Sequence, residues 1–306
     1  MTSTALSVTG LTKRYGSRTA VDQLDIELPS GVVAGFVGPN GAGKTTTMAM
    51  LLGLVRPTAG TGTVLGSSID APDQYLPRVG ALIESPAFYP ALSGAANLRV
   101  FAIVAGHDTT RIPSLLAEVG LEGRGDDRYR SYSLGMKQRL GIAAALLGDP
   151  DLLILDEPAN GLDPQGVREM RSLIGRLAET GRTVLVSSHD LSELEQVCDW
   201  LVLIDTGKSL YQGPTRALLD GVVGGLAVVP PAERLDDLLA LLAARGHQVS
   251  AEDRRLVIDV DGADVAVLAG EVNRAAFDAG IVLVELSPLR TTLEDRYLSM
   301  VQGDAR

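Results

Sequence analysis

The segment GPNGAGKT at residues 38–45 constrains the fold of this chain more than any other part of the sequence. It directly follows the apolar run VVAGFVG at 32–38 and precedes a segment with a helical pattern that starts at Lys44. Glycines let backbone amides close around phosphate oxygens, and the amino end of the next helix favours negative charge. This order therefore predicts a phosphate-binding loop between a buried strand and a helix, rather than a chance glycine-rich turn.

Two motifs together predict nucleoside triphosphate hydrolysis. In the first loop, Lys44 is expected to reach the β and γ phosphates, and the hydroxyl of Thr45 to bind Mg²⁺. In the second motif, LLILDEP, an apolar strand ends at Asp156, which is placed to hold Mg²⁺, and Glu157, which is placed to polarise the attacking water. The predicted nucleotide-binding residues of the loop are Gly38, Pro39, Asn40, Gly41, Ala42, Gly43, Lys44, Thr45 and Thr46.

Short β-type runs alternate with helical patterns through the first two-thirds of the chain. After the run at 32–38, further runs occur at 152–156, 183–188 and 201–205. Such alternation predicts an α/β fold with a largely parallel sheet. Residues 99–147 are mostly helical in pattern, which indicates a helical insertion between the strands.

The pattern changes after residue 220. The sequence GVVGG and the pair Pro230-Pro231 predict a linker. Beyond it, segments from a strand at 226–229 to a strand at 281–286 follow the order β-α-β-β-α-β, which is typical of ferredoxin-like folds. We therefore expect two domains, residues 1–220 and residues 221–306, the second supporting a dimer or contacting another protein.

Composition excludes several classes of partner and location. The net charge of −11 argues against binding to nucleic acid, which depends on clustered Lys and Arg. One cysteine, Cys198, and the absence of a signal-like segment over 1–11 favour the cytoplasm. The longest charge-free segment, 28–43, is broken by Pro and Gly and is too short to span a bilayer. Any membrane-spanning helices of a complex would therefore belong to another chain.

A second phosphate site is predicted by SYSLGMKQRLGIAAALL at 131–147, where Ser133 and Gly135 open a helix. Because the chain already has a phosphate-binding loop, a second such site suggests a second subunit. The sequence YSLGM followed by KQR and LLILDEP resembles the signature and Walker B motifs of ATP-binding cassette (ABC) ATPases. Two positions depart from that family's LSGGQ pattern, with Leu134 in place of Gly and Met136 in place of Gln.

The resemblance extends over residues 5 to about 220 and assigns further residues. Tyr15 matches the aromatic residue on which adenine stacks, and Glu84 falls at the Q-loop position. Asp163 in ANGLD resembles the D-loop residue, although it could simply close a turn before the following proline. His189 resembles the switch histidine that senses the γ phosphate.

The resemblance also implies an architecture and partners. It implies an ABC cassette of the P-loop NTPase class, with a RecA-like core, an antiparallel β subdomain and a helical subdomain, that binds ATP and Mg²⁺. Two cassettes would pack head to tail, as a homodimer or with a sister subunit, through contacts between the P-loop and the signature. A separate polytopic permease would hold the protein at the inner face of the cell membrane.

Glu84 points to a subfamily, because the family commonly has Gln at this position. A Glu in the context IESPAFYP, together with the C-terminal TTLEDRYLSMVQG, is similar to ATPases that export bacitracin and lantibiotics. Glu84 would bind Mg²⁺ or, alternatively, lie on a coupling surface. Phe88, Tyr89 and Leu92 would form a surface for the permease or would cover the core of the helical insertion.

Two other functions remain open on the sequence. One is a soluble ABC ATPase that is not coupled to transport. The other is a regulatory module that binds ATP and hydrolyses little, against which the presence of Lys44, Asp156, Glu157 and His189 argues. The antibiotic or drug-like cargo of an exporter would be selected by the permease, and this chain does not specify it.

Overall fold

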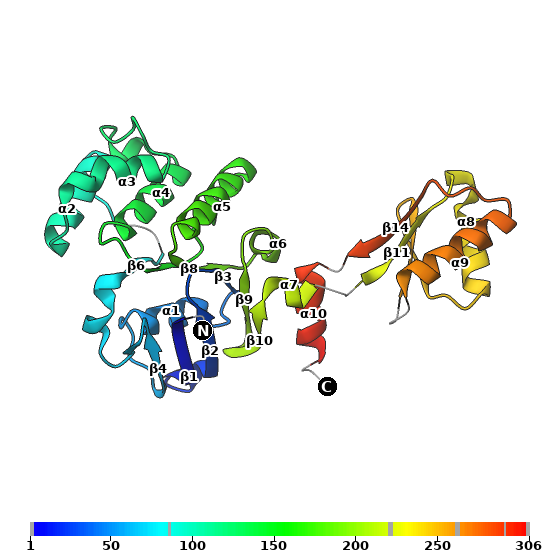
Figure 1. The fold of residues 1–306 in the computed structure, drawn as a ribbon, viewed down its shortest axis with the longest axis horizontal. Coiled ribbons are helices and arrows are strands. Elements are labelled where there is room, and N and C mark those ends of the chain that lie inside the picture. Colours follow the sequence, from blue (N-terminus) through cyan, green and yellow to red (C-terminus); the bar gives the residue numbers. More distant parts are fainter. Residues whose placement is uncertain (1–2, 85–86, 220–222, 261–263, 291, 304–306) are drawn as a thin grey trace. The chain divides into compact units, whose positions relative to one another are not determined.

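The computed structural model describes residues 3–84, 87–219, 223–260, 264–290 and 292–303. The chain divides into two compact units, one of residues 1–217 with 300–306 and the other of residues 218–299 (Figure 1). The domain boundary between residues 220 and 221 stays a prediction.

The central sheet of the first unit has the strand order β10-β9-β3-β8-β7-β6 (Figure 1). Its five strands from β9 to β6 are parallel, and β10 is antiparallel at one edge. β7 and β8 are buried along their whole length, which explains why they read as continuous apolar runs. The predicted α/β fold with a largely parallel sheet is confirmed. The strands are β3 (Val33–Val37), β6 (Val79–Leu82), β7 (Leu152–Leu155), β8 (Thr183–Ser188), β9 (Trp200–Asp205) and β10 (Lys208–Pro214).

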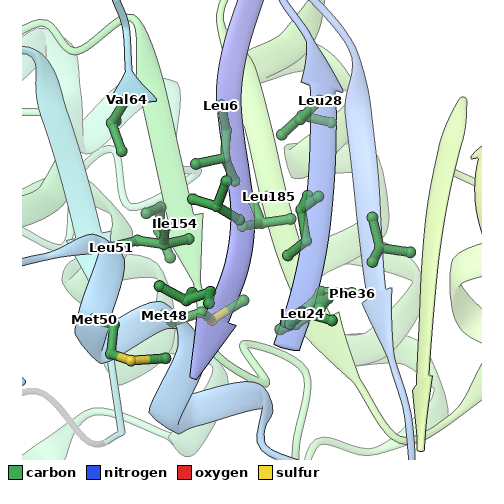
Figure 2. Close-up of a cluster of buried hydrophobic side chains, with 14 of the residues drawn as sticks. Leu6, Leu24, Leu28, Phe36, Met48, Met50, Leu51, Val64, Ile154 and Leu185 are labelled. Atoms are coloured by element: carbon green, nitrogen blue, oxygen red, sulfur yellow. The ribbon is translucent and has the colours of Figure 1, made fainter. Parts of the chain in front are cut away.

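The first unit also contains a second sheet, which is antiparallel and has the strand order β2-β1-β4-β5. Figure 2 shows its leucines, such as Leu6 and Leu28, in the same apolar cluster as Phe36 of the central sheet and Met48 of α1. This shared core holds the first hairpin against the loop between β3 and α1. The elements are β1 (Thr4–Tyr15), β2 (Arg18–Pro29), β4 (Ala59–Val64), β5 (Ser67–Ser68) and α1 (Lys44–Leu51).

The predicted helical insertion consists of three helices that contact one another. Ser93 caps the first of them, because its Oγ accepts a hydrogen bond from the amide of Ala96 at 3.2 Å. That helix ends at Gly106, whose φ of +72° is the left-handed conformation common at helix ends. The helices of the unit are α2 (Gly94–Ala105), α3 (Ile112–Glu118), α4 (Leu134–Ala145), α5 (Pro164–Glu179), α6 (Leu191–Glu195) and α7 (Thr215–Leu219). Short 3₁₀ turns are η1 (Pro72–Gln74), η2 (Leu76–Arg78), η3 (Thr109–Arg111) and η4 (Tyr129–Ser131).

The second unit has a four-stranded antiparallel sheet in the order β12-β13-β11-β14. The residues of α8 and α9 that pack with it form one buried core with Leu226, Val228 and Leu256. The predicted β-α-β-β-α-β order is confirmed. The elements are β11 (Val223–Val229), η5 (Ala232–Arg234), α8 (Leu235–Ala244), β12 (Val249–Glu252), β13 (Arg255–Ile258), α9 (Val265–Asp278) and β14 (Glu285–Arg290), and α10 (Leu293–Gly303) follows.

Two sequence predictions for this unit are wrong in detail. Gly224 and Gly225 of GVVGG do not mark a linker, because they belong to β11, while Gly221 and Val222 lie outside the described ranges. A Cβ on Gly225 would lie 3.0 Å from the carbonyl oxygen of Ile258, so the glycine permits a close approach of strands. The last strand is Glu285–Arg290 rather than 281–286, since Ile281 is buried in the core and pairing with β11 begins at Glu285.

Candidate functional site

The loop after β3 is held by two glycines that leave no room for a side chain. A Cβ on Gly38 would lie 2.4 Å from the carbonyl oxygen of Ile204. Gly43 has a φ of +103°, and a Cβ there would lie 2.6 Å from the carbonyl oxygen of Ala20. The loop therefore packs tightly between β9 and the first hairpin, which fixes where its amides lie.

Lys44, the first residue of α1, lies at the centre of this loop. It is buried, and its Nζ donates hydrogen bonds to the carbonyl oxygens of Gly38 at 2.7 Å and Pro39 at 3.3 Å. The same ammonium group lies 3.4 Å from Oε1 of Glu157. The structure thus places a buried cation between the phosphate-binding loop and the carboxylate at the end of β7.

Asp156 and Glu157 lie together at the carboxyl end of β7. Oδ2 of Asp156 accepts a hydrogen bond of 2.7 Å from the hydroxyl of Thr45. Glu157 has a φ of +46°, a left-handed conformation that is uncommon for a residue with a side chain. Its Oε2 lies 3.1 Å from Nδ1 of His189. The structure therefore brings Lys44, Thr45, Asp156, Glu157 and His189 into one hydrogen-bonded and ion-paired group.

Ser187 joins the two acidic residues and was missed by the sequence analysis. Its hydroxyl donates to Oδ1 of Asp156 at 2.5 Å and accepts from the amide of Glu157 at 2.9 Å. The side chain is fully buried near the end of β8, the strand next to β7. A pair of serines at the carboxyl end of a strand whose middle residues are apolar was the available signal.

Residues of the phosphate-binding loop and of the first hairpin line the same cavity. Tyr15 at the end of β1 is half-exposed, and Nζ of Lys13 lies 5.0 Å from the centroid of its ring. Arg18 at the start of β2 lines the same cavity and was not identified from the sequence. The cavity is lined by Tyr15, Arg18, Ala20, Asn40, Gly41, Gly43, Lys44, Thr45, Thr46 and Glu157.

The signature residues line a different cavity, which Lys44 does not line. The hydroxyl of Ser133 accepts a hydrogen bond from the amide of Met136 at 3.3 Å and so caps α4. Asp163 caps α5, because its Oδ1 accepts from the amide of Gly166 at 2.7 Å. Ser133, Leu134, Gly135 and Asp163 all line this second cavity. Within one chain, the predicted nucleotide contacts are thus divided between two surfaces.

Glu84 lies two residues after β6 with a φ of +57°, and its side chain is exposed. Within the described part of the chain it makes no hydrogen bond or ion pair with Thr45 or Asp156. The two residues that follow it lie outside the described ranges. Its role as a metal ligand stays a prediction.

The apolar residues that follow Glu84 do not form one exposed surface. Phe88 is buried and makes edge-on ring contacts with Phe101 and Tyr129, both with centroids 5.2 Å apart. Of the two alternatives for Phe88, these contacts support the core of the helical insertion rather than a surface for a permease. Tyr89 is exposed, and Leu92 is partly buried.

The segment after β8 is held by a helix cap next to His189. Asp190 accepts hydrogen bonds from the amide of Ser192 at 2.9 Å and from its hydroxyl at 2.7 Å. The hydrogen bond from the Ser192 side chain is the main cause that lowers the pKa of Asp190. In contrast, burial, and secondarily the charge of Asp190, raises the pKa of Glu193 above its usual value.

A strand, a phosphate-binding loop and a helix that face a second strand ending in Asp-Glu define a P-loop nucleoside triphosphatase. Comparison with known proteins identifies the family. The family model described as ABC transporter matches residues 21–160, and a domain of unknown function matches residues 228–294.

Three known proteins illustrate the likeness. The bacitracin transport ATP-binding protein BcrA of Bacillus licheniformis is 48% identical over 215 residues, which are 69% of this chain and 70% of that protein. BcrA of Enterococcus faecalis is 44% identical over 305 residues, 96% of this chain and 95% of that protein. The solved structure of CbiO1 from Clostridium perfringens, part of the ABC transporter complex CbiONQ, is 26% identical, with a TM-score of 0.65 over 70% of this chain and 90% of that one.

This chain therefore belongs to the family of ABC transporter ATP-binding proteins. The resemblance to ABC ATPases of the bacitracin type, the cassette fold and the assignment as an ATPase are confirmed. The residue assignments within the site stay predictions, and the geometry above is what supports them.

Proposed function

We propose that this chain hydrolyses ATP to energise the export of an antibiotic peptide or another drug-like substrate through a separate membrane permease. The observation that carries the proposal is the convergence of Lys44, Thr45, Asp156, Glu157 and His189 at the carboxyl ends of β3, β7 and β8. The cargo class is supported by 44% identity to a bacitracin transport ATP-binding protein along 96% of the chain.

The residues present fit Mg²⁺, which prefers oxygen ligands and keeps several waters. The hydroxyl of Thr45 and the carboxylate of Asp156, 2.7 Å apart, would hold the ion. Among the described residues, no group of three or more His, Cys, Asp or Glu side chains could hold a metal. When bound, Mg²⁺ would neutralise charge on the phosphates and orient them.

Glu157 would act on the attacking water as the general base, and the groups around it would position its carboxylate. The hydroxyl of Ser187 fixes the amide of Glu157, and His189 holds one carboxylate oxygen. Lys44 would bind the phosphates through its ammonium group, which requires it to share or leave its 3.4 Å contact with Glu157. Nucleotide binding would thereby free the carboxylate to accept a proton from water.

The active state would contain two chains arranged head to tail, either identical or a chain with its sister subunit. In this chain Ser133, Gly135 and Asp163 line a cavity distinct from the one lined by Lys44. A nucleotide in the Lys44 cavity would meet signature residues only if a second subunit supplied them. This division is what supports the dimer.

The permease would dock on the exposed side chains near the C-terminal end of α2 rather than on Phe88. Ile103 and Val104 of α2 are 66% and 84% exposed. Next to them Phe101 lines a cavity with Val79 and Ala81 of the central sheet. None of the helices in the described ranges is both long enough and apolar enough to cross a bilayer. A polytopic partner would therefore provide the membrane path and hold this chain at the inner face of the cell membrane.

The test is an affinity purification of the tagged chain from detergent-extracted membranes. We expect a polytopic protein to copurify with the wild-type chain and to be lost with the double variant Ile103→Asp, Val104→Asp. Leu54→Asp is the matched control, because Leu54 is equally exposed at 69% but lies after α1 and outside the proposed surface. A wild-type chain that stays without a membrane partner would favour the alternative of an ATPase that is not coupled to transport.

A further inference from the structure

We propose that Arg18 is a nucleotide-binding residue whose guanidinium group binds the polyphosphate of the bound nucleotide. The inference rests on nucleotide binding in the cavity beside Lys44 and does not depend on the transport partner. Arg18 is the first residue of β2, and it pairs with Tyr15 across the turn that joins the first two strands. Both side chains line the same cavity as the phosphate-binding loop.

The backbone that carries Arg18 is fixed against the phosphate-binding loop. The carbonyl oxygen of Ala20 lies so close to Gly43 that a Cβ there would be only 2.6 Å away. Further along β2, the amide of Asp22 donates to the carbonyl oxygen of Gly207 at 2.9 Å, and the amide of Gly207 donates to the carbonyl oxygen of Ala42 at 3.0 Å. These two hydrogen bonds, both made by Gly207, connect β2 to the phosphate-binding loop.

This placement directs the Arg18 side chain toward the loop. Residues two apart on a strand lie on the same face, and Ala20, like Arg18, lines the cavity. Nη2 of Arg18 lies 3.8 Å from the position that a Cβ on Gly41 would occupy. The guanidinium group therefore already lies beside the loop whose amides would face phosphate oxygens, and no backbone movement is required to bring it there.

Arg18 combines a positive charge with the absence of an ion-pair partner among the residues that line this cavity. The cavity contains two cations, Arg18 and Lys44, and one carboxylate, that of Glu157. The ammonium group of Lys44 is already used, since it contacts two loop carbonyls and Glu157. Arg18 forms no ion pair with any carboxylate in the described ranges, although acidic residues outnumber basic ones by 38 to 27. It is therefore the cation of this cavity that is free for an anionic ligand.

The chemistry of the side chain favours phosphate over the base. A guanidinium group offers five donors in a planar arrangement that matches phosphate oxygens and remains charged at any physiological pH. The other cations of this hairpin near Tyr15 are Lys13 and Arg14, and neither lines the cavity. Nζ of Lys13 donates to the carbonyl oxygen of Arg56 at 2.7 Å. Arg18 thus differs from both neighbouring cations in its position at the cavity, and from Lys13 also in having no competing partner.

The experiment compares purified Arg18→Ala, Arg18→Lys and Arg14→Ala with the wild-type chain. Arg14 is the matched control, because it is an exposed arginine of the same hairpin that does not line the cavity and its removal changes the net charge equally. ATP and ADP affinities are measured by calorimetry with EDTA present, so that no divalent ion contributes. Inorganic pyrophosphate, which displaces a fluorescent ATP analogue, serves as the probe without a base. Thermal melting checks that each variant is folded.

We expect Arg18→Ala to weaken ATP, ADP and pyrophosphate binding by about tenfold each, as is typical for loss of a charged hydrogen bond. Arg18→Lys should recover part of the loss, because it keeps the charge without the planar donor pair. Arg14→Ala should bind like the wild type. The proposal is overturned if Arg18→Ala binds like Arg14→Ala, or if ATP binding falls while pyrophosphate binding does not. Lys44→Ala, measured in parallel, reports on the phosphate-binding loop itself, so that failure of the loop assignment is told apart from failure of Arg18.

Discussion

Nζ of Lys44 lies 3.4 Å from Oε1 of Glu157, so the cation expected to hold phosphate is paired with the carboxylate expected to activate water. The pair is largely shielded, with side-chain exposures of 5% and 22%. On the other side of Glu157, His189 lies 3.1 Å from Oε2. Before nucleotide binds, both carboxylate oxygens thus have a partner. Phosphate oxygens would compete for Lys44, and this competition links nucleotide binding to the readiness of Glu157.

Glu157→Gln should separate nucleotide binding from hydrolysis. The amide cannot accept the proton of water, so we expect phosphate release to fall by at least about 100-fold. ATP affinity should be retained, because the variant removes the carboxylate that competes for Lys44. Light scattering with ATP and Mg²⁺ should show a trapped dimer. Glu179→Gln, at an exposed position at the end of α5, is the control and should hydrolyse ATP normally. Wild-type turnover in Glu157→Gln would sink its assignment as the base.

Lys44→Ala should weaken ATP binding through loss of a buried positive charge. Charged hydrogen bonds contribute about 1.5–3 kcal/mol, so we expect a loss of about 10–100-fold in affinity, measured by calorimetry. The variant also leaves Glu157 without its cation, which adds repulsion toward the phosphates. Lys208→Ala removes an exposed lysine on β10 and should bind ATP like the wild type. Unchanged affinity in Lys44→Ala would count against the phosphate-binding loop.

The sequence predicted those parts of the site that follow directly from a strand end. GPNGAGKT and LLILDEP each place their polar residues where a buried strand stops, and neighbouring parallel strands bring such ends together. Ser187 and Arg18 were missed for different reasons. Ser187 reads as part of a strand, and only the pairing of β7 with β8 brings its hydroxyl to Asp156. From the sequence alone, Arg18 is interpreted as a surface charge. Its position beside the phosphate-binding loop follows from the packing of β2 against Gly43.

The order of the helices and strands in the second unit was predicted correctly, but their boundaries were not. The run IVLV at 281–284 has high β propensity, but β14 begins at Glu285, just after the amide of Val284 donates to the carbonyl oxygen of Val229 in β11 at 2.7 Å. Gly225 was taken for a linker residue because glycine marks both flexible segments and close strand contacts. Phe88 likewise could cover a core or face a partner, and sequence spacing alone does not distinguish these environments.

Ser187→Ala should impair catalysis more than folding. Its hydroxyl contacts both Asp156 and the amide of Glu157, so its loss leaves a partly buried amide and a buried carboxylate each without one partner. We expect the free energy of unfolding to fall by about 1–3 kcal/mol and kcat by about tenfold, with a smaller change in ATP affinity. Denaturant titration and steady-state kinetics measure these values. A variant with wild-type kcat would show that Ser187 has no part in positioning Glu157.

Glu84→Gln tests whether the exposed carboxylate faces a metal. If Glu84 contributes to Mg²⁺ binding, the neutral amide should bind the ion more weakly, and half-maximal hydrolysis should require more Mg²⁺. The melting temperature should not change, because the side chain is exposed. Asp151→Asn, which removes another carboxylate away from the site, controls for net charge. Identical Mg²⁺ titrations of Glu84→Gln and the wild type would indicate a coupling-surface role instead.

Glu193→Gln should stabilise the protein at neutral pH. Burial and the charge of Asp190 raise the pKa of Glu193, so the folded protein holds its proton more tightly than the unfolded chain does. The ionised carboxylate therefore costs stability at pH values above its folded pKa, and the neutral amide avoids that cost. As pH falls below the unfolded value of about 4.3, both forms become neutral and the difference in melting temperature should vanish. Glu179→Gln, at the exposed end of α5, is the comparison for loss of one charge. Equal melting temperatures of Glu193→Gln and the wild type at pH 7.5 would contradict the raised pKa.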